Sequence, residues 1–143
     1  NESRLNIARK IGAVEEAINV SGDKWSEYIL PSSFDAVLDF AGVAGMENKL
    51  IESAKWRGRV LFIAGRFNIN YEFNLGQRKE ITIMQNSHFD NSDLQNVCRL
   101  TEKGLLDIAS LITSVVPVSE AKNIYDVLRD KPDELLGTVF DWT

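Results

Sequence analysis

Two short stretches of this sequence end in a residue pair that could receive a flat ligand. The apolar runs 34–40 and 59–64 each have strand length and each stop at an Ala-Gly pair, whose glycines are Gly42 and Gly65. In parallel sheets, ligands bind beyond the carboxyl ends of the strands, and a glycine there lets a ligand approach the backbone. The pattern therefore predicts a ligand site at these glycines. Asp39, near the end of the first run, could accept a ligand hydroxyl or bond to the neighbouring loop backbone, and both readings stay open.

The other side chains that could carry chemistry are isolated. His88 is the only histidine, so a multi-histidine metal site cannot be built from this sequence, and we expect a solvated loop residue. Cys98 falls on the apolar face of a predicted helix with no base evident nearby, which predicts a small buried hydrophobe. The sequence thus indicates neither a catalytic residue nor a metal ligand.

The glycine loop that binds phosphate in nucleotide-binding proteins is missing from this sequence. Residues 42–45 read Gly-Val-Ala-Gly, without G-x-G-x-x-G spacing, and Gly-Lys-Ser/Thr does not occur. That loop and the helix N-terminus after it bind the pyrophosphate of a dinucleotide. The residues alone therefore indicate an incomplete nucleotide-binding sheet with glycines that face a ligand.

A strand–helix–strand unit must position these glycines. Between the two apolar runs, Met46, Leu50, Ile51 and Ala54 recur on one face of a helix, which predicts a crossover between parallel strands. The near-continuous apolar runs predict a parallel sheet covered by helices on both faces. Further elements are predicted from cap residues, alternation and glycine or proline stops: helices after Ser3, Asp23, Ser92 (with Gln95 as a capping box) and Pro117, and strands at 17–20, 71–74, 80–84 and 137–142.

Composition narrows the classes of partner. The 143 residues carry a net charge of −5 with scattered basic residues, which argues against nucleic acid or an anionic membrane as a partner. No apolar run approaches the roughly 20 residues of a membrane span. The single cysteine is compatible with a reducing cytoplasm, where we expect the protein to be located.

Five segments, in order, resemble the medium-chain, mostly zinc-dependent alcohol and polyol dehydrogenases. Residues 4–13 resemble the helix after the second Rossmann strand, and residues 34–42 and 58–65 resemble the fourth and fifth strands of the family. Residues 78–83 resemble a later "RKELTIKGS" strand, and residues 104–117 resemble the C-terminal tail. The resemblance implies an α/β fold, an incomplete Rossmann-like doubly wound parallel sheet followed by a C-terminal α+β segment of the catalytic domain. It implies a partial nucleotide-binding domain at 1–86 and the catalytic-domain segment at 87–143. We expect a fragment whose glycine-rich loop, first Rossmann strands and zinc-binding catalytic domain lie upstream.

The same resemblance assigns cofactor contacts by position. Arg4 would lie beside the adenosine ribose, Phe40, Ala41 and Gly42 would line the cofactor between adenine and nicotinamide ribose, and Ala64, Gly65 and Arg66 would border the nicotinamide. Backbone groups of Met84 and Asn86 would meet its carboxamide.

The implied function is hydride transfer between NAD or NADP and an alcohol or polyol, with zinc in the whole protein and its ligands outside this chain. The 143 residues alone are expected to be inactive and to form a homodimer through a sheet edge near Tyr71–Asn74. Two alternatives stay open: a zinc-free reductase of the quinone-reductase type, and a non-catalytic binding or dimerising module derived from a Rossmann domain. A Rossmann-like methyltransferase is disfavoured, because its different glycine pattern and reversed final strand are not found here.

Overall fold

The computed structural model describes the backbone of residues 1–143 and every side chain except that of Asp23. The chain divides into two compact units, which we call the sheet unit (Val20–Phe89) and the terminal unit (Asn1–Asn19 with Asp90–Thr143). The break at Phe89 lies close to the predicted domain boundary at 86, whereas residues 1–19 cluster with the C-terminal residues. The predicted assignment of 1–86 and 87–143 to two domains of a larger protein stays a prediction.

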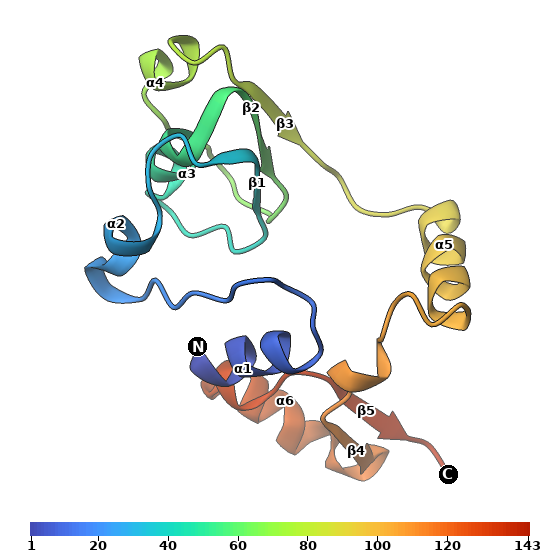
Figure 1. Cartoon of the computed structure of the whole chain (residues 1–143). Helices are drawn as coiled ribbons and strands as arrows, with labels where there is room; N and C mark the ends of the chain where they lie inside the picture. Colours follow the sequence, from blue (N-terminus) through green and yellow to red (C-terminus); the bar gives the residue numbers. More distant parts are fainter. The chain divides into compact units, whose positions relative to one another are not determined.

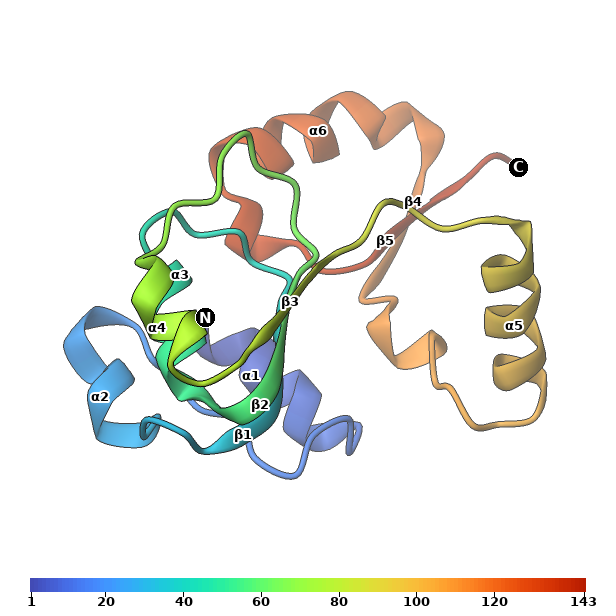
Figure 2. The ribbon, with the colours of Figure 1, turned by 90° about the horizontal axis from the view of Figure 1, so that it is seen from above.

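The sheet unit is built on three parallel strands, β1 (Phe34–Asp39), β2 (Ala54–Phe62) and β3 (Thr82–Gln85), in the order β1-β2-β3. The predicted strand–helix–strand crossover is confirmed, with α3 (Glu47–Ser53) between β1 and β2. The helices α2 (Trp25–Tyr28), α3 and α4 (Phe73–Gln77) lie on the same side of this sheet in Figure 1 and in Figure 2.

The core of the sheet unit lies between the sheet and these helices. Leu50 and Ile51 of α3 are buried against Val60 and Phe62 of β2, as the helical spacing of the apolar residues predicted. On the opposite face, Leu38, Leu61 and Met84 are register neighbours across the three strands, and Leu38 and Met84 are 51% and 42% exposed. Because successive strand residues point to opposite faces, β2 buries Val60 and Phe62 on one face and turns Leu61 to the other.

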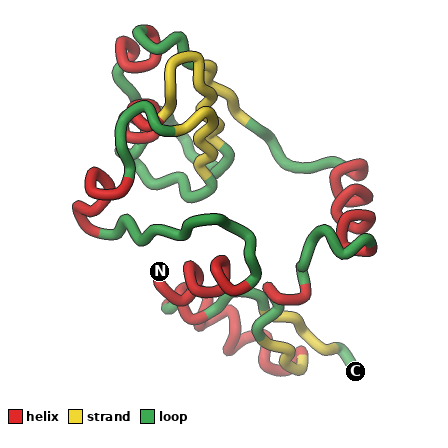
Figure 3. Tube along the Cα trace, viewed as in Figure 1, coloured by secondary structure: helices red, strands yellow, loops and turns green.

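The terminal unit combines α1 (Glu2–Lys10) with the C-terminal elements. The strands β4 (Ser114–Pro117) and β5 (Thr138–Asp141) pair in parallel and are connected through α6 (Ala121–Asp130), while α5 (Asn91–Glu102) precedes them. Arg4 of α1 donates to the carbonyl oxygens of Pro132 and Leu135 at 2.9 and 3.1 Å. Figure 3 shows the distribution of helix, strand and loop along the chain.

Two predicted strands are wrong. Residues 17–20, all within the described backbone, form no strand, and the Ala17 carbonyl accepts a hydrogen bond from Arg9. Residues 71–74 are not a sheet edge either, because α4 begins at Phe73. Tyr71 precedes α4 and Leu75 lies within it, and both side chains pack against the core without the segment pairing as a strand.

Two predicted caps are displaced by two residues. Asn1 caps α1 in place of Ser3, accepting from the amides of Ser3 and Arg4. Asp90 caps α5 in place of Ser92, and Asp93 completes its capping box. In both cases an earlier Asn or Asp offers a strong acceptor, so the helix begins one half-turn sooner. The predicted end of α5 at Gly104, which has a φ of +67°, is confirmed.

No helix among the described residues is long and apolar enough to cross a lipid bilayer.

The close approach of Gly137 to Leu111 predicts a substitution that should damage the terminal unit. A Cβ atom at Gly137 would lie 2.1 Å from the Leu111 carbonyl oxygen, beside the bond from Thr113 to the Gly137 carbonyl that opens the β4–β5 pair. Gly137→Ala should therefore lower the free energy of unfolding by about 2 kcal/mol or more, as overpacking does. Gly76→Ala, at a helical glycine whose Cβ would meet nothing within 4 Å, should be neutral or slightly stabilising. Urea denaturation of both variants measures the difference, and equal stabilities would contradict the prediction.

Candidate functional site

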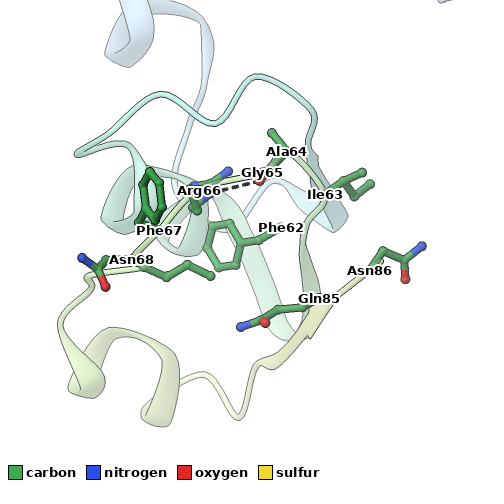
Figure 4. Close-up of a pocket in the computed structure, with 10 residues that line it drawn as sticks. Phe62, Ile63, Ala64, Gly65, Arg66, Phe67, Asn68, Gln85 and Asn86 are labelled. Atoms are coloured by element: carbon green, nitrogen blue, oxygen red, sulfur yellow. Dashed lines mark hydrogen bonds between the residues drawn. The ribbon is translucent and has the colours of Figure 1, made fainter. Parts of the chain in front are cut away.

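The carboxyl ends of β2 and β3 border a cavity of about 400 Å³. Its wall is formed by the end of β2 and the loop that follows, from Phe62 to Ile69, together with Gln85 and Asn86 at the end of β3. Figure 4 shows these side chains, with Gln85 at the end of β3 and Asn86 directly after it. The cavity lies at the end of the sheet where a parallel α/β fold places its ligands. Of the two Ala-Gly pairs, Ala64 and Gly65 line it, whereas Ala41 and Gly42 do not.

Asp39 joins the loops that follow β1 and β2. Its carboxylate accepts from the backbone amides of Ala41 and Gly42 at 3.0 and 2.9 Å, and its backbone carbonyl accepts from the amides of Ile63 and Ala64, each at 3.0 Å. The residue is only 6% exposed. Of the two readings that the sequence left open, the structure supports the second, in which Asp39 bonds to loop backbone.

Arg66 binds the same carboxylate from the loop after β2. One of its Nη atoms donates to Asp39, the other lies 3.5 Å from Glu47 Oε1, and its Nε donates to the Ala64 carbonyl at 3.4 Å, the dashed bond in Figure 4. The guanidinium lies 5.0 Å from the centre of the Phe62 ring. All three charged side chains are at least nine-tenths buried, so Asp39, Glu47 and Arg66 form a buried charge cluster.

The environment of Asp39 favours its ionised form. Burial by itself would raise the pKa of the carboxyl group, but the Gly42 amide, the Arg66 guanidinium and the Ala41 amide together outweigh burial and hold the pKa below its ordinary value. The carboxylate therefore stays charged and paired at neutral pH.

The two glycines have different roles. Gly42 has a φ of +64°, and a Cβ there would lie 2.9 Å from the Ala64 Cβ, so the residue allows close packing of the two loops. A Cβ at Gly65 would meet nothing within 4 Å, so this glycine leaves open space beside the cavity.

The structure brings most of the predicted cofactor residues to one end of the sheet. Residues 40–42 follow β1, residues 64–66 follow β2, and Asn86 follows β3. Met84 lies within β3 on the exposed apolar row and does not line the cavity. Arg4 belongs to the terminal unit, where its guanidinium binds two backbone carbonyls. Cofactor contacts of these residues stay predictions.

Sequence reasoning missed Glu47 and the pairing of Arg66. In the sequence, Glu47 and Arg66 appear only as charged residues that follow the two apolar runs. Their spacing does not indicate that their side chains come into contact. Cys98, predicted to be buried on the inner face of α5, is exposed. The amphipathic pattern of α5 predicts a buried face, but Leu94 and Val97 on that face are also exposed in the structure. His88 is exposed and has a φ of +31°.

Substitution of Asp39 should destabilise the sheet unit in a pH-dependent way. Asp39→Asn removes one partner of a buried ion pair, which should cost about 3 kcal/mol at neutral pH. Because the folded-state pKa of Asp39 lies below its ordinary value of 3.8, the stabilisation is present above that value and is lost as the pH falls through the lower folded-state pKa. The difference in stability between wild type and variant should therefore shrink in acid.

Urea denaturation followed by tryptophan fluorescence, at neutral pH and in acid, measures this difference. Asp35→Asn is the matched control in the same strand, because its ion pair with Lys55 is exposed to solvent, and it should change stability little. A stability difference between wild type and Asp39→Asn that stays constant with pH would contradict the assigned role of the carboxylate.

Comparison with known proteins shows which sequences and structures this chain resembles. No protein-family model matches the chain. In sequence it is 27% identical over 140 residues to the 2-desacetyl-2-hydroxyethyl bacteriochlorophyllide A dehydrogenase of Rhodobacter capsulatus, a match that covers 96% of the chain and 42% of that protein.

In structure the chain resembles alcohol dehydrogenases. The short chain alcohol dehydrogenase RspB of E. coli CFT073, complexed with the cofactor NADH, superposes with a TM-score of 0.83 at 18% identity, covering 99% of this chain and 42% of that one. The alcohol dehydrogenase TADH of Thermus sp. ATN1 superposes with a TM-score of 0.77 at 21% identity, covering 100% and 42%. The chain thus spans about two fifths of the length of these proteins. It has the α/β fold, with parallel sheets, of the corresponding part of an alcohol dehydrogenase, and the resemblance predicted from its sequence is confirmed.

Proposed function

We propose that this chain is the part of an NAD(P)-dependent oxidoreductase that receives the nicotinamide end of the cofactor, in a protein that transfers hydride to or from an alcohol or polyol carbon. The observation that carries the proposal is the cavity at the carboxyl ends of β2 and β3, in a fold shared with an alcohol dehydrogenase complexed with NADH. The dehydrogenase of Rhodobacter capsulatus supports the same reaction class.

The residues at the cavity fit a nicotinamide ring with its carboxamide. Gly65 leaves open space on its Cβ side, and Gln85 and Asn86 offer amide groups that can both donate and accept hydrogen bonds. When bound, the nicotinamide supplies the hydride chemistry. The chain's own residues would orient the ring and exclude water from it, with Ala64, Gly65 and Arg66 bordering it and Phe40, Ala41 and Gly42 lining the adjoining riboses. Arg4 is proposed for the adenosine end.

A zinc site does not fit the residues of this chain. Among the described side chains, no three of His, Cys, Asp or Glu gather where they could hold a metal ion. If the whole protein uses zinc, as most members of the resembled family do, its ligands come from outside the 143 residues. A zinc-free reductase of the quinone-reductase type stays the alternative within the same proposal. A cytoplasmic location is part of the proposal and rests on the resemblance and composition alone.

Binding of reduced nicotinamide tests the proposal. NADH should bind weakly, in the millimolar range, because the chain lacks the glycine loop that holds the pyrophosphate. The binding should shift the NMR signals of residues 63–66 and 85–86. Gly65→Leu places a side chain in the open space and should abolish binding without unfolding the protein. Gly65→Ala, which adds one carbon there, is the matched control and should bind nearly as wild type does. Absence of any signal shift at saturating NADH would refute the proposal and favour the non-catalytic module.

We expect the 143 residues by themselves to be catalytically inactive, because the group that activates the alcohol is not among them. Incubation with NAD or NADP and a panel of alcohols and polyols, followed at the absorbance of the reduced cofactor, should give no turnover. Measurable oxidation by the purified chain would overturn this expectation.

A homodimer is also proposed, although the edge strand on which the prediction rested is absent from residues 71–74. These residues lead into α4, where Phe73 is largely exposed and could take part in a helical contact. Light scattering at tens of micromolar should give the mass of two chains, and Phe73→Ser should shift it toward one chain. A monomer at that concentration would exclude the proposed dimer.

A further inference from the structure

The buried charge cluster connects three separate segments of the sheet unit. Asp39 ends β1, Glu47 begins α3, and Arg66 lies in the loop after β2. Arg66 contacts both carboxylates, and its side chain is only 10% exposed. The guanidinium is therefore the group through which these segments meet.

The bonds of Asp39 extend this connection to the backbone of both loops. Its carboxylate holds the amides of Ala41 and Gly42, while its carbonyl holds those of Ile63 and Ala64. Arg66 itself donates to the Ala64 carbonyl. A displacement of the guanidinium would thus release the Asp39 carboxylate on one side and the loop after β2 on the other.

The positive charge of the Arg66 guanidinium compensates the two buried carboxylates around it. Asp39 and Glu47 are two buried acidic side chains that share one cation. Without it, Asp39 would keep only its two amide donors, and the buried charge of Glu47 would lose its ion-pair partner. The Nη1 atom beside Glu47 is fully buried and has no hydrogen-bond acceptor among the described residues. This atom lies 3.5 Å from Glu47 Oε1, so its contact with the cluster is electrostatic.

We propose that Arg66 is a positioning residue. Its guanidinium, held between Asp39 and Glu47, fixes the turn at 40–42 against the loop at 63–66, and in this way sets the shape of the cavity. The consequence for the cofactor rests on the proposed function, whereas the positioning of the loops does not.

Amide hydrogen exchange measured by NMR tests the positioning directly. In Arg66→Met, the amides of Ala41, Gly42, Ile63 and Ala64 should exchange about tenfold faster or more, because their local opening becomes easier. Amides within the β1–β2 ladder, such as those of Val37 and Val60, should keep their rates. Arg59→Met, which removes an exposed arginine from β2, is the matched control and should change none of the four amides.

Arg66→Lys separates charge from geometry. Lysine keeps one cation but has no planar fork to contact Asp39, Glu47 and the Ala64 carbonyl together, so it should restore protection only in part. If Arg66→Met does not fold, the comparison of Arg66→Lys with wild type decides the matter through the same four amides. Unchanged exchange of these amides, or an equal acceleration of every amide in the sheet unit, would overturn the proposal, since the latter describes a general stabiliser.

NADH titration of the same proteins gives the functional result. Affinity should fall at least about tenfold in Arg66→Met, lie in between for Arg66→Lys and equal wild type for Arg59→Met. If Arg66→Met binds as tightly as wild type, the positioning has no bearing on the cavity and the proposal fails. If wild type binds no NADH, the proposed function fails, and the exchange rates still decide whether Arg66 positions the loops.

Discussion

A buried carboxylate at the end of β1 ties together the ligand end of the sheet. Asp39 is surrounded by donors of three kinds: two amides of its own turn, the guanidinium of Arg66 and, through its carbonyl, two amides of the neighbouring loop. A buried charge is tolerated only when such partners are present. Other arrangements of the loops at 40–42 and 63–66 are disfavoured, because most of them would leave the Asp39 carboxylate unpaired.

Strand register and core packing in the sheet unit position Asp39 and its partners. The parallel register of β1 with β2 places Asp39 opposite Phe62, and thereby brings the loop that carries Arg66 next to the turn that carries Gly42. Core packing of α3 against β2 places Glu47, at the start of that helix, on the second side of the guanidinium. Gly42 then allows the loops to approach more closely than any other residue would permit. Hydrophobic packing fixes the positions of the strands and α3, and the ion pairs stabilise one arrangement of the loops that follow β1 and β2.

Much of the sheet unit could be predicted from the sequence because its signals were local and mutually consistent. Two apolar runs of strand length, with a helical face between them and glycines after them, allow few arrangements other than a parallel crossover. The predictions failed where short patterns compete. Residues 71–74 alternate like a strand over four positions, yet a helix begins at Phe73, and Tyr71 before it and Leu75 within it both pack against the core. Residues 17–20 have the composition of a strand but pair with no other strand among the described residues. A strand without hydrogen bonds to a neighbouring strand has no stability of its own.

The sequence by itself determined the crossover from β1 through α3 to β2, where the ligand end of the sheet lies, and which glycines stand there. These properties follow from the spacing of apolar residues and from backbone freedom, both of which act within a few residues along the chain. The sequence did not show that β2 begins at Ala54, a residue that its spacing had assigned to the helix. Only the tertiary structure decided that Asp39 bonds to loop backbone, that Arg66 and Glu47 join it, and that α1 clusters with the C-terminal elements. Charge pairing between residues 27 positions apart leaves no trace in local spacing. It depends on which strand ends the folded sheet brings side by side.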